Sequence, residues 1–116
     1  MLVDSHCHLD FSEFEEDLPL VLQRAQESGV GVLQTICTRI SRFPEVLALT
    51  SGRDNIYCSI GIHPHNVDDE PEFKPVQILS EIDLNKKIIG IGETGLDYFY
   101  DNSSREKQQA SFVAHI

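Results

Sequence analysis

Short apolar runs alternate with amphipathic stretches four times along the chain, which predicts four strand–helix units. Runs rich in β-branched residues predict a first strand that begins with Leu2 and Val3. They predict three further strands over residues 30–36, 56–62 and 88–91. The stretches between them have apolar residues at helical spacing, namely Leu18, Val21, Leu22 and Ala25, then Phe43, Val46, Leu47 and Thr50, and then Val76, Leu79 and Ile82. We expect each of these sets to form the apolar face of a helix.

Residues at the ends of two stretches predict where their helices begin and end. Asp17 is a suitable N-cap for the first helix, and Gly29 is well placed to end it. Ser103-x-x-Glu106 has the capping-box pattern, in which two side chains bond the backbone at a helix start. The last helix is therefore predicted to open there and to continue to the final residue.

Four consecutive strand–helix units predict an α/β protein with a parallel sheet. A closed TIM-type (β/α)8 barrel has eight such units in about 250 residues. We therefore expect residues 1–116 to form a single domain that is half of such a barrel. Because the chain stops inside the predicted helical stretch 110–116, we also expect it to be a truncated amino-terminal half. An open doubly wound sheet is the alternative, since four units also suffice for that architecture.

The net charge of −10 argues against a protein that grips nucleic acid through a basic surface. Proteins that bind the phosphate backbone normally have a basic face, because neutralising phosphates supplies most of their affinity. An acidic protein can act on phosphate esters when metal ions supply the local positive charge. Any nuclease activity must therefore depend on a metal site.

The sequence also predicts a cytoplasmic protein without membrane contact. No apolar run approaches the roughly 20 residues that span a bilayer. The first ten residues have neither the basic flank nor the long apolar stretch of a signal peptide. The three cysteines are odd in number and irregularly spaced, which suits a reducing compartment better than a disulfide framework.

Unusual polar residues follow three of the four predicted strands. The first strand runs into His6-Cys7-His8, the third into Gly61-Ile62-His63-Pro64-His65, and the fourth into Gly92-Glu93-Thr94-Gly95-Leu96-Asp97. Active-site groups of parallel βα proteins gather at these carboxyl ends of strands. Residues two apart on a strand point to the same side, so both imidazoles of the first motif can face one metal ion.

Each motif also has a simpler interpretation when it is taken alone. A lone H-x-H pair usually binds nothing, and His63 before a proline is often only a turn residue. Glu93 could be a carboxylate that is stabilised by the amino end of a helix. The three motifs occur at matching ends of one sheet, and this shared position favours a metal site. Asp4 could orient a ligand histidine or simply cap a loop.

The motifs resemble those of TatD-type metal-dependent deoxyribonucleases, within the amidohydrolase superfamily. The matching blocks are VDSHCHLD at 3–10, GIHPHN at 61–66 and IGIGETGLDY at 89–98, and their order and spacing also match. The resemblance covers essentially the whole chain. It implies a (β/α)8 barrel with a two-metal site that hydrolyses phosphodiester bonds in DNA, so DNA is the expected substrate.

The resemblance also implies roles for individual residues. His6 and His8 correspond to ligands of one metal, and Glu93 corresponds to a catalytic carboxylate that touches both metals. His63 corresponds to a catalytic position near the substrate phosphate, and Asp97 to a substrate-binding position that lines the pocket. Two divalent ions would activate water for attack on phosphorus and stabilise the developing charge. Magnesium is the expected ion, and an imidazole-rich site also suits manganese or zinc.

The chain lacks part of what the resemblance implies. The remaining ligands of the family are two histidines and an aspartate on later strands, and His115 matches neither histidine. We therefore expect the isolated chain to have little or no nuclease activity. A half barrel also leaves two sheet edges and apolar surface open, which predicts a homodimer or association through these edges.

Two other functions remain open at this point. The first is a metal-dependent hydrolase of the amidohydrolase type that acts on another ester or on an amide, because the fold does not choose the substrate. The second is a catalytically silent fragment that serves as an assembly module. The G-E-T-G-L-D block favours the nuclease over the first of these, and metal binding without turnover would favour the second.

Overall fold

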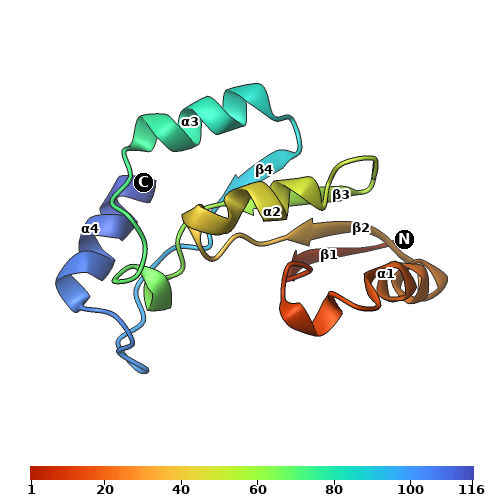
Figure 1. Ribbon diagram of the computed structural model, residues 1–116, viewed down its shortest axis with the longest axis horizontal. Helices are drawn as coiled ribbons and strands as arrows, with labels where there is room; N and C mark the ends of the chain where they lie inside the picture. Colours follow the sequence, from red (N-terminus) through yellow and green to blue (C-terminus); the bar gives the residue numbers. More distant parts are fainter.

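The computed structural model describes all residues 1–116 and has four strands that alternate with four helices (Figure 1). The strands are β1 (Leu2–Cys7), β2 (Val30–Thr35), β3 (Ile56–Ile60) and β4 (Ile88–Ile91). The helices are α1 (Leu18–Glu27), α2 (Phe43–Ala48), α3 (Pro75–Leu84) and α4 (Arg105–His115), and the short 3-10 turns are η1 (Ser12–Phe14), η2 (Ile40–Arg42) and η3 (Pro64–Asn66). The predicted four strand–helix units are confirmed. None of the helices combines the length and the apolar character that crossing a bilayer requires.

The four strands form one parallel sheet in the order β1-β2-β3-β4. A doubly wound sheet instead reverses its strand order partway across. The strictly sequential order is that of successive units in a (β/α) barrel. The doubly wound alternative is therefore wrong for this chain.

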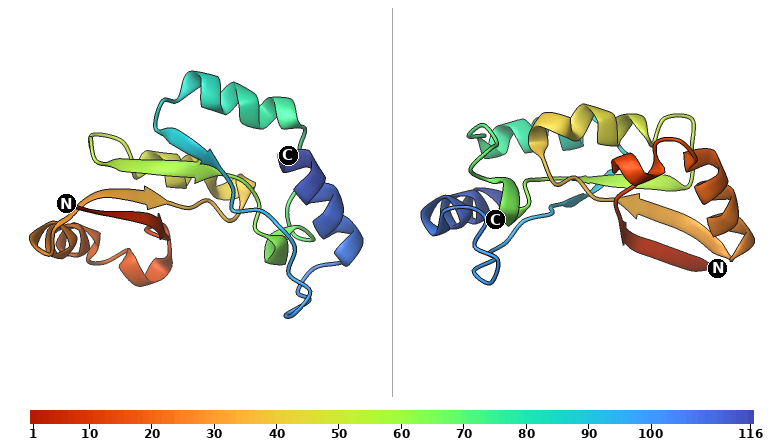
Figure 2. Two further views of the ribbon diagram at one scale, coloured as in Figure 1. Left: turned by 180° about the vertical axis from the view of Figure 1, so that it is seen from behind. Right: turned by 60° about the horizontal axis from the view of Figure 1, so that its bottom comes forward.

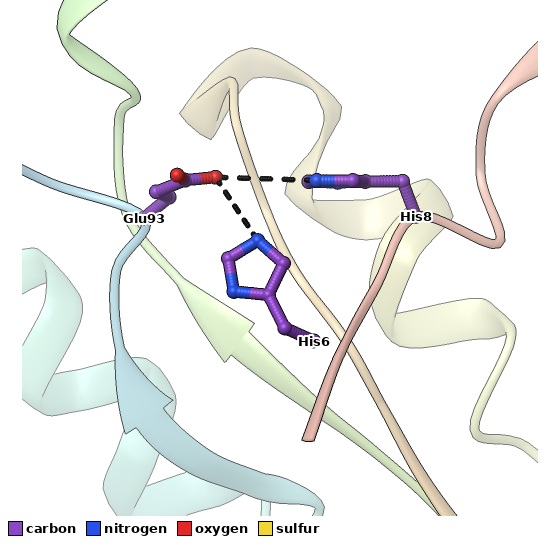
Figure 3. Close-up of side chains that lie close together, drawn as sticks. All are labelled: His6, His8 and Glu93. Carbon is purple, nitrogen blue, oxygen red and sulfur yellow. Dashed lines mark ion pairs between the residues drawn. The ribbon is translucent and has the colours of Figure 1, made fainter. Parts of the chain in front are cut away.

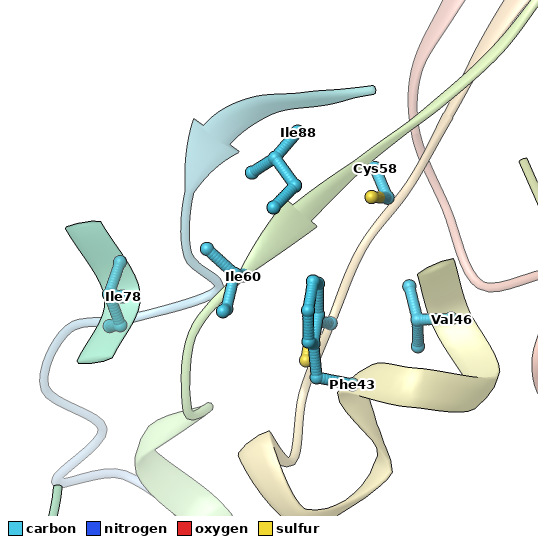
Figure 4. Close-up of a cluster of buried hydrophobic side chains, with 7 residues drawn as sticks. Phe43, Val46, Cys58, Ile60, Ile78 and Ile88 are labelled. Atoms are coloured by element: carbon cyan, nitrogen blue, oxygen red, sulfur yellow. The ribbon is translucent and has the colours of Figure 1, made fainter. Parts of the chain in front are cut away.

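Helices α1, α2 and α3 cover the same face of the sheet. Along β3, Ile56 packs with apolar residues of α1, whereas Cys58 and Ile60 pack with Val46 of α2 and Ile78 of α3 (Figure 4). Residues two apart on a strand point to one side, so all three helices share that side of β3 (Figure 2, right). Ile56 and Ile60 are almost fully buried, and full burial of such a side chain stabilises the fold by about 1.5–3 kcal/mol.

Both outer strands of the sheet leave apolar side chains in solvent. Leu2 and Val3 of β1 are exposed, as are Ile89 and Ile91 of β4. Strand β1 pairs only with β2, and β4 pairs only with β3, so each has an unpaired backbone edge. Open edges beside apolar side chains are surfaces on which other strands can pair.

Of the apolar face predicted for α3, only Ile82 packs against the core, and the buried face is centred on Ile78 instead. Ile78 is 3% exposed, and Ile82 packs against the same core cluster, whereas Val76 is 60% exposed and Leu79 is also exposed. Two apolar stripes run along this helix, and helical spacing alone cannot decide which of them docks. The stripe of Ile78 and Ile82 wins because it meets Ile60 and Ile88 of the neighbouring strands.

Helix α1 begins at Leu18 after Asp17, as predicted, whereas local contacts change its cap and move the start of α4. Asp17 gives α1 no side-chain cap and instead forms an ion pair with Arg24 at 3.1 Å. Ser103 does not cap α4, because its hydroxyl donates to the carbonyl of His65 at 2.8 Å. Helix α4 therefore begins at Arg105, after Ser104 as N-cap. The first strand is longer than its apolar start implied and includes the histidine-containing segment up to Cys7.

Candidate metal centre

The carboxyl ends of β1 and β4 bring three of the predicted ligands together (Figure 3). His6 Nε2 lies 3.5 Å from Glu93 Oε2, and His8 Nε2 lies 4.0 Å from the same oxygen. One ligand atom from each residue can be chosen so that all lie within 4.8 Å of one another. The structure therefore brings the H-x-H motif and the glutamate after β4 to one point.

The donor atoms of this cluster fit a divalent metal ion. With metal–ligand bonds of roughly 2.0–2.2 Å, neighbouring ligand atoms around a bound ion lie roughly 3.0–3.5 Å apart. The observed separations from Glu93 Oε2 are close to that range. His8 Nδ1 lies 3.3 Å from the carbonyl oxygen of Ile36. Donation from Nδ1 to this carbonyl leaves the lone pair of Nε2 free for a metal, as is usual for ligand histidines.

The backbone around Glu93 is fixed by hydrogen bonds to two neighbouring strand ends. Its N–H donates to the carbonyl of Cys37 at 2.8 Å, and the N–H of Gly92 donates to the carbonyl of Ile60 at 2.8 Å. The Gly92 carbonyl accepts from the Ser59 hydroxyl at 2.6 Å. Gly92 has φ +151°, which side-chain-bearing residues rarely adopt. These hydrogen bonds hold the Gly92–Glu93 backbone in place and so fix where the Glu93 side chain begins.

The segment that directly follows β2 supplies three backbone carbonyls to the site and none of the candidate metal ligands. The carbonyls of residues 36–38 bond in turn to the His8 ring, the Glu93 N–H and the His63 N–H, the last at 2.9 Å. This contribution could not be predicted from the sequence, because every residue type carries the same backbone carbonyl. One strand end therefore sets the relative positions of three candidate site residues.

His63 lies on the other side of the Glu93 carboxylate. Its Nε2 is 3.5 Å from Glu93 Oε1, whereas His6 and His8 face Oε2. His63 Nδ1 accepts the backbone N–H of His65 at 3.0 Å. A backbone N–H can only donate, so neutral His63 carries its proton on Nε2, toward Glu93. Burial lowers the pKa of His63, although the Glu93 carboxylate opposes that effect.

Asp97 pairs with His65 and does not reach the three-residue cluster. Its Oδ2 contacts His65 Nε2, and its Oδ1 accepts the N–H groups of Phe99 at 3.0 Å and Tyr100 at 3.1 Å. The hydrogen bond from His65 and these backbone donors lower the pKa of Asp97. Sequence reasoning did not single out His65. Its place two residues after His63 in H-P-H was the feature that could have indicated it.

Asp4 and Cys7, which flank the first histidine, have structural roles. Asp4 Oδ1 accepts the backbone N–H of His6 at 3.1 Å and so holds the strand rather than an imidazole. The Cys7 thiol donates to the carbonyl of Gln34 at 3.3 Å. Burial and nearby carboxylates raise the pKa of Cys7 to about 12, so the thiol is protonated near neutral pH. A protonated thiol is a poor metal ligand.

His115 is buried in α4 away from the cluster and connects that helix to the end of β3. Its Nε2 accepts the N–H of Ile62 at 3.1 Å, its Nδ1 donates to the Ser111 carbonyl at 2.7 Å, and its ring lies edge-on to Phe73. Both ring nitrogens are therefore used within the fold. The interpretation that His115 is not one of the metal ligands agrees with this position.

The free energy of unfolding should decrease as the pH is lowered, in part because of His115. Burial lowers its folded-state pKa, so the unfolded chain, with a pKa of about 6.5, binds the proton more readily. This contribution to stability is complete above about pH 6.5 and is lost as the pH falls toward the folded pKa. In His115→Gln, urea titrations from about pH 7.5 to pH 5 should give a shallower pH dependence. Parallel curves for the two proteins would contradict this assignment.

Comparison with known proteins relates this site to a family. Residues 3–116 match the family described as TatD related DNase. An uncharacterized metal-dependent hydrolase from Buchnera aphidicola is 38% identical over 99% of this chain and 44% of its own length. YcfH from Escherichia coli K12, also an uncharacterized metal-dependent hydrolase, is 36% identical over 99% of this chain and 43% of its own. The chain thus spans less than half the length of these relatives.

Solved structures show the same fold. The crystal structure of YjjV, a TatD homologue from Escherichia coli K12, superposes with a TM-score of 0.87 over 98% of this chain and 44% of YjjV, at 32% identity. A TatD family hydrolase from Entamoeba histolytica gives a TM-score of 0.81 at 23% identity and shows the fold alone. The prediction of half a TIM-type barrel is confirmed. The chain belongs to the TatD-related DNase family, and its four βα units correspond to half of a (β/α)8 barrel.

Proposed function

We propose that this chain contributes metal ligands to a hydrolase that cleaves phosphodiester bonds in DNA. The observation that carries the proposal is the meeting of His6, His8 and Glu93 at one point on the carboxyl side of the sheet. The family description supports DNA as the substrate class. The net charge of −10 adds a constraint, because a phosphate can approach such a protein closely only where bound cations offset the charge.

The three residues differ in what they do for the metal. His6 and His8 would hold one ion through Nε2, with Glu93 Oε2 as this chain's third ligand atom. Glu93 Oε1 points the other way, toward His63, and would be the ligand atom for a second ion. When bound, the ions supply activation of water and neutralisation of charge on phosphoryl oxygens. Magnesium is the proposed ion, and the imidazole donors also suit manganese or zinc.

The substrate side of the site is formed by His63 and the Asp97–His65 pair. His63 presents Nε2–H beside Glu93, where it can donate a hydrogen bond to a phosphate oxygen. This donor and the Glu93 carboxylate are the two groups placed to act on the reacting atoms. Asp97 belongs to this region through His65, which it contacts directly.

We expect the chain by itself to have little or no activity. Three side chains would hold one ion only weakly, and a second ion would have only Glu93 from this chain. The exposed edges of β1 and β4 favour association with further strands, for which a homodimer is the simplest form. The free thiols Cys7, Cys37 and Cys58 support a reducing compartment such as the cytoplasm.

One preparation of the purified chain can test these proposals together. Light scattering should give the mass of a dimer or larger species, and incubation with single-stranded DNA and Mg²⁺ or Mn²⁺ should give little cleavage. Strong cleavage that His6→Ala abolishes would show that three ligands suffice and would overturn the expected inactivity. Cleavage of another ester without DNA cleavage would favour a different substrate class. A monomer at high concentration would contradict the association.

A further inference from the structure

Gln108 is a fully buried polar side chain in α4, and every polar atom of its amide is used. It is 0% exposed. Its Oε1 accepts the Asp97 N–H at 2.8 Å, and its Nε2 donates to the carbonyls of Asp97 at 3.2 Å and Ser103 at 2.8 Å. Burying an amide is costly unless it is hydrogen-bonded, so this side chain strongly favours one position of the residue 97–103 loop.

Asp97 and Ser103, which Gln108 bonds, both contact His65. The Asp97 carboxylate contacts the His65 ring, and the Ser103 hydroxyl donates to the His65 carbonyl at 2.8 Å. Gln108 therefore restrains His65 at two places: the His65 ring through Asp97, and the His65 backbone carbonyl through Ser103. Figure 1 shows α4 beside the η3 turn, which contains this histidine.

From His65 the chain of contacts reaches the candidate metal centre. The His65 N–H donates to His63 Nδ1 at 3.0 Å, and the two rings lie edge to face with centroids 4.4 Å apart. The donation requires a lone pair on Nδ1 and so places the proton of neutral His63 on Nε2, which faces Glu93. If His65 moved, its N–H would no longer bond His63 Nδ1, and neutral His63 could carry its proton on either ring nitrogen.

We propose that Gln108 is a positioning residue that fixes His63 as its Nε2–H tautomer beside Glu93, acting through Asp97, Ser103 and His65. It touches neither the metal ligands nor a substrate. The placement itself depends only on contacts within the chain, whereas its use in orienting a phosphate rests on the proposed function. Asp97 thus acts by holding His65, since both of its carboxylate oxygens are already engaged within the fold.

The test is the tautomer of His63 in metal-free protein, read from imidazole ¹⁵N chemical shifts. The wild type should show one tautomer, with Nδ1 unprotonated and Nε2 protonated. Gln108→Leu should convert this to a mixture, because it removes all three bonds to the residue 97–103 loop. Gln109→Leu is the matched control, since its neighbouring amide donates only to the Tyr98 hydroxyl on the surface. An unchanged single tautomer in folded Gln108→Leu would overturn the proposal.

Two further variants keep the test decisive if Gln108→Leu fails to fold. Asp97→Asn weakens the contact with the His65 ring, and Ser103→Ala removes the hydrogen bond to the His65 carbonyl. Each variant should give a partial mixture of tautomers, and the double variant should contain more of the minor tautomer. An unchanged tautomer in all of them would refute the positioning role of Gln108. A wild type that binds no Mn²⁺ would refute the proposed function and leave the tautomer result standing.

Discussion

His8→Ala should weaken Mn²⁺ binding by roughly 100-fold or more, because loss of a group that merely orients a ligand already costs about 10–100-fold. His8 is chosen because its ring is less exposed than that of His6 and is fixed by the carbonyl of Ile36. Its Nε2 is therefore already oriented before an ion arrives. With only His6 and Glu93 left, the chain cannot hold an ion against water.

Titration calorimetry with Mn²⁺ on the purified chain measures this effect directly. Glu93→Gln should be as damaging, since it keeps the volume of the side chain but removes the charge that both imidazoles face. Cys7→Ala is the matched control, because Cys7 lies between the two histidines and its thiol bonds the Gln34 carbonyl. Similar Mn²⁺ affinities for His8→Ala and Cys7→Ala would mean that the ion binds elsewhere.

The ligand cluster could be predicted because two simple regularities determine it. The spacing of His6 and His8 places both rings on one side, and the parallel order of the strands brings Glu93 to the same end of the sheet. Neither regularity requires knowledge of how side chains pack. The strand and helix pattern was predictable for the same reason.

The surroundings of the cluster depend on packing and could not be read in this way. Ser103 illustrates the limit, since a capping-box pattern predicted a helix cap and the hydroxyl instead bonds the His65 carbonyl. Gln108 is polar in a helix and would ordinarily be assigned to the surface, yet it is fully buried. Both residues take their roles from the way α4 docks beside η3. Helix α3 shows the same limit, because spacing could not decide which of its apolar stripes docks.

Gly61→Ala should be the most disruptive single-atom addition near the site. A Cβ at position 61 would lie 2.6 Å from the carbonyl carbon of Gly92, 2.7 Å from its Cα and 2.8 Å from its oxygen. These are backbone atoms, so no side chain can turn away to make room. Gly92 is itself held by Ile60 and Ser59. Forced repacking of this kind costs about 1–3 kcal/mol in the free energy of unfolding.

The same clash should displace the neighbouring Glu93 and so weaken Mn²⁺ binding, in addition to lowering stability. Gly52→Ala separates the two effects, because Gly52 has φ +68° and open space around its missing Cβ. That variant should lose about 1–2 kcal/mol through backbone strain alone and bind Mn²⁺ as the wild type does. Urea unfolding and calorimetry on both variants provide the comparison. If Gly61→Ala were destabilised yet bound Mn²⁺ normally, the close approach of β3 and β4 would support the fold without positioning the carboxylate.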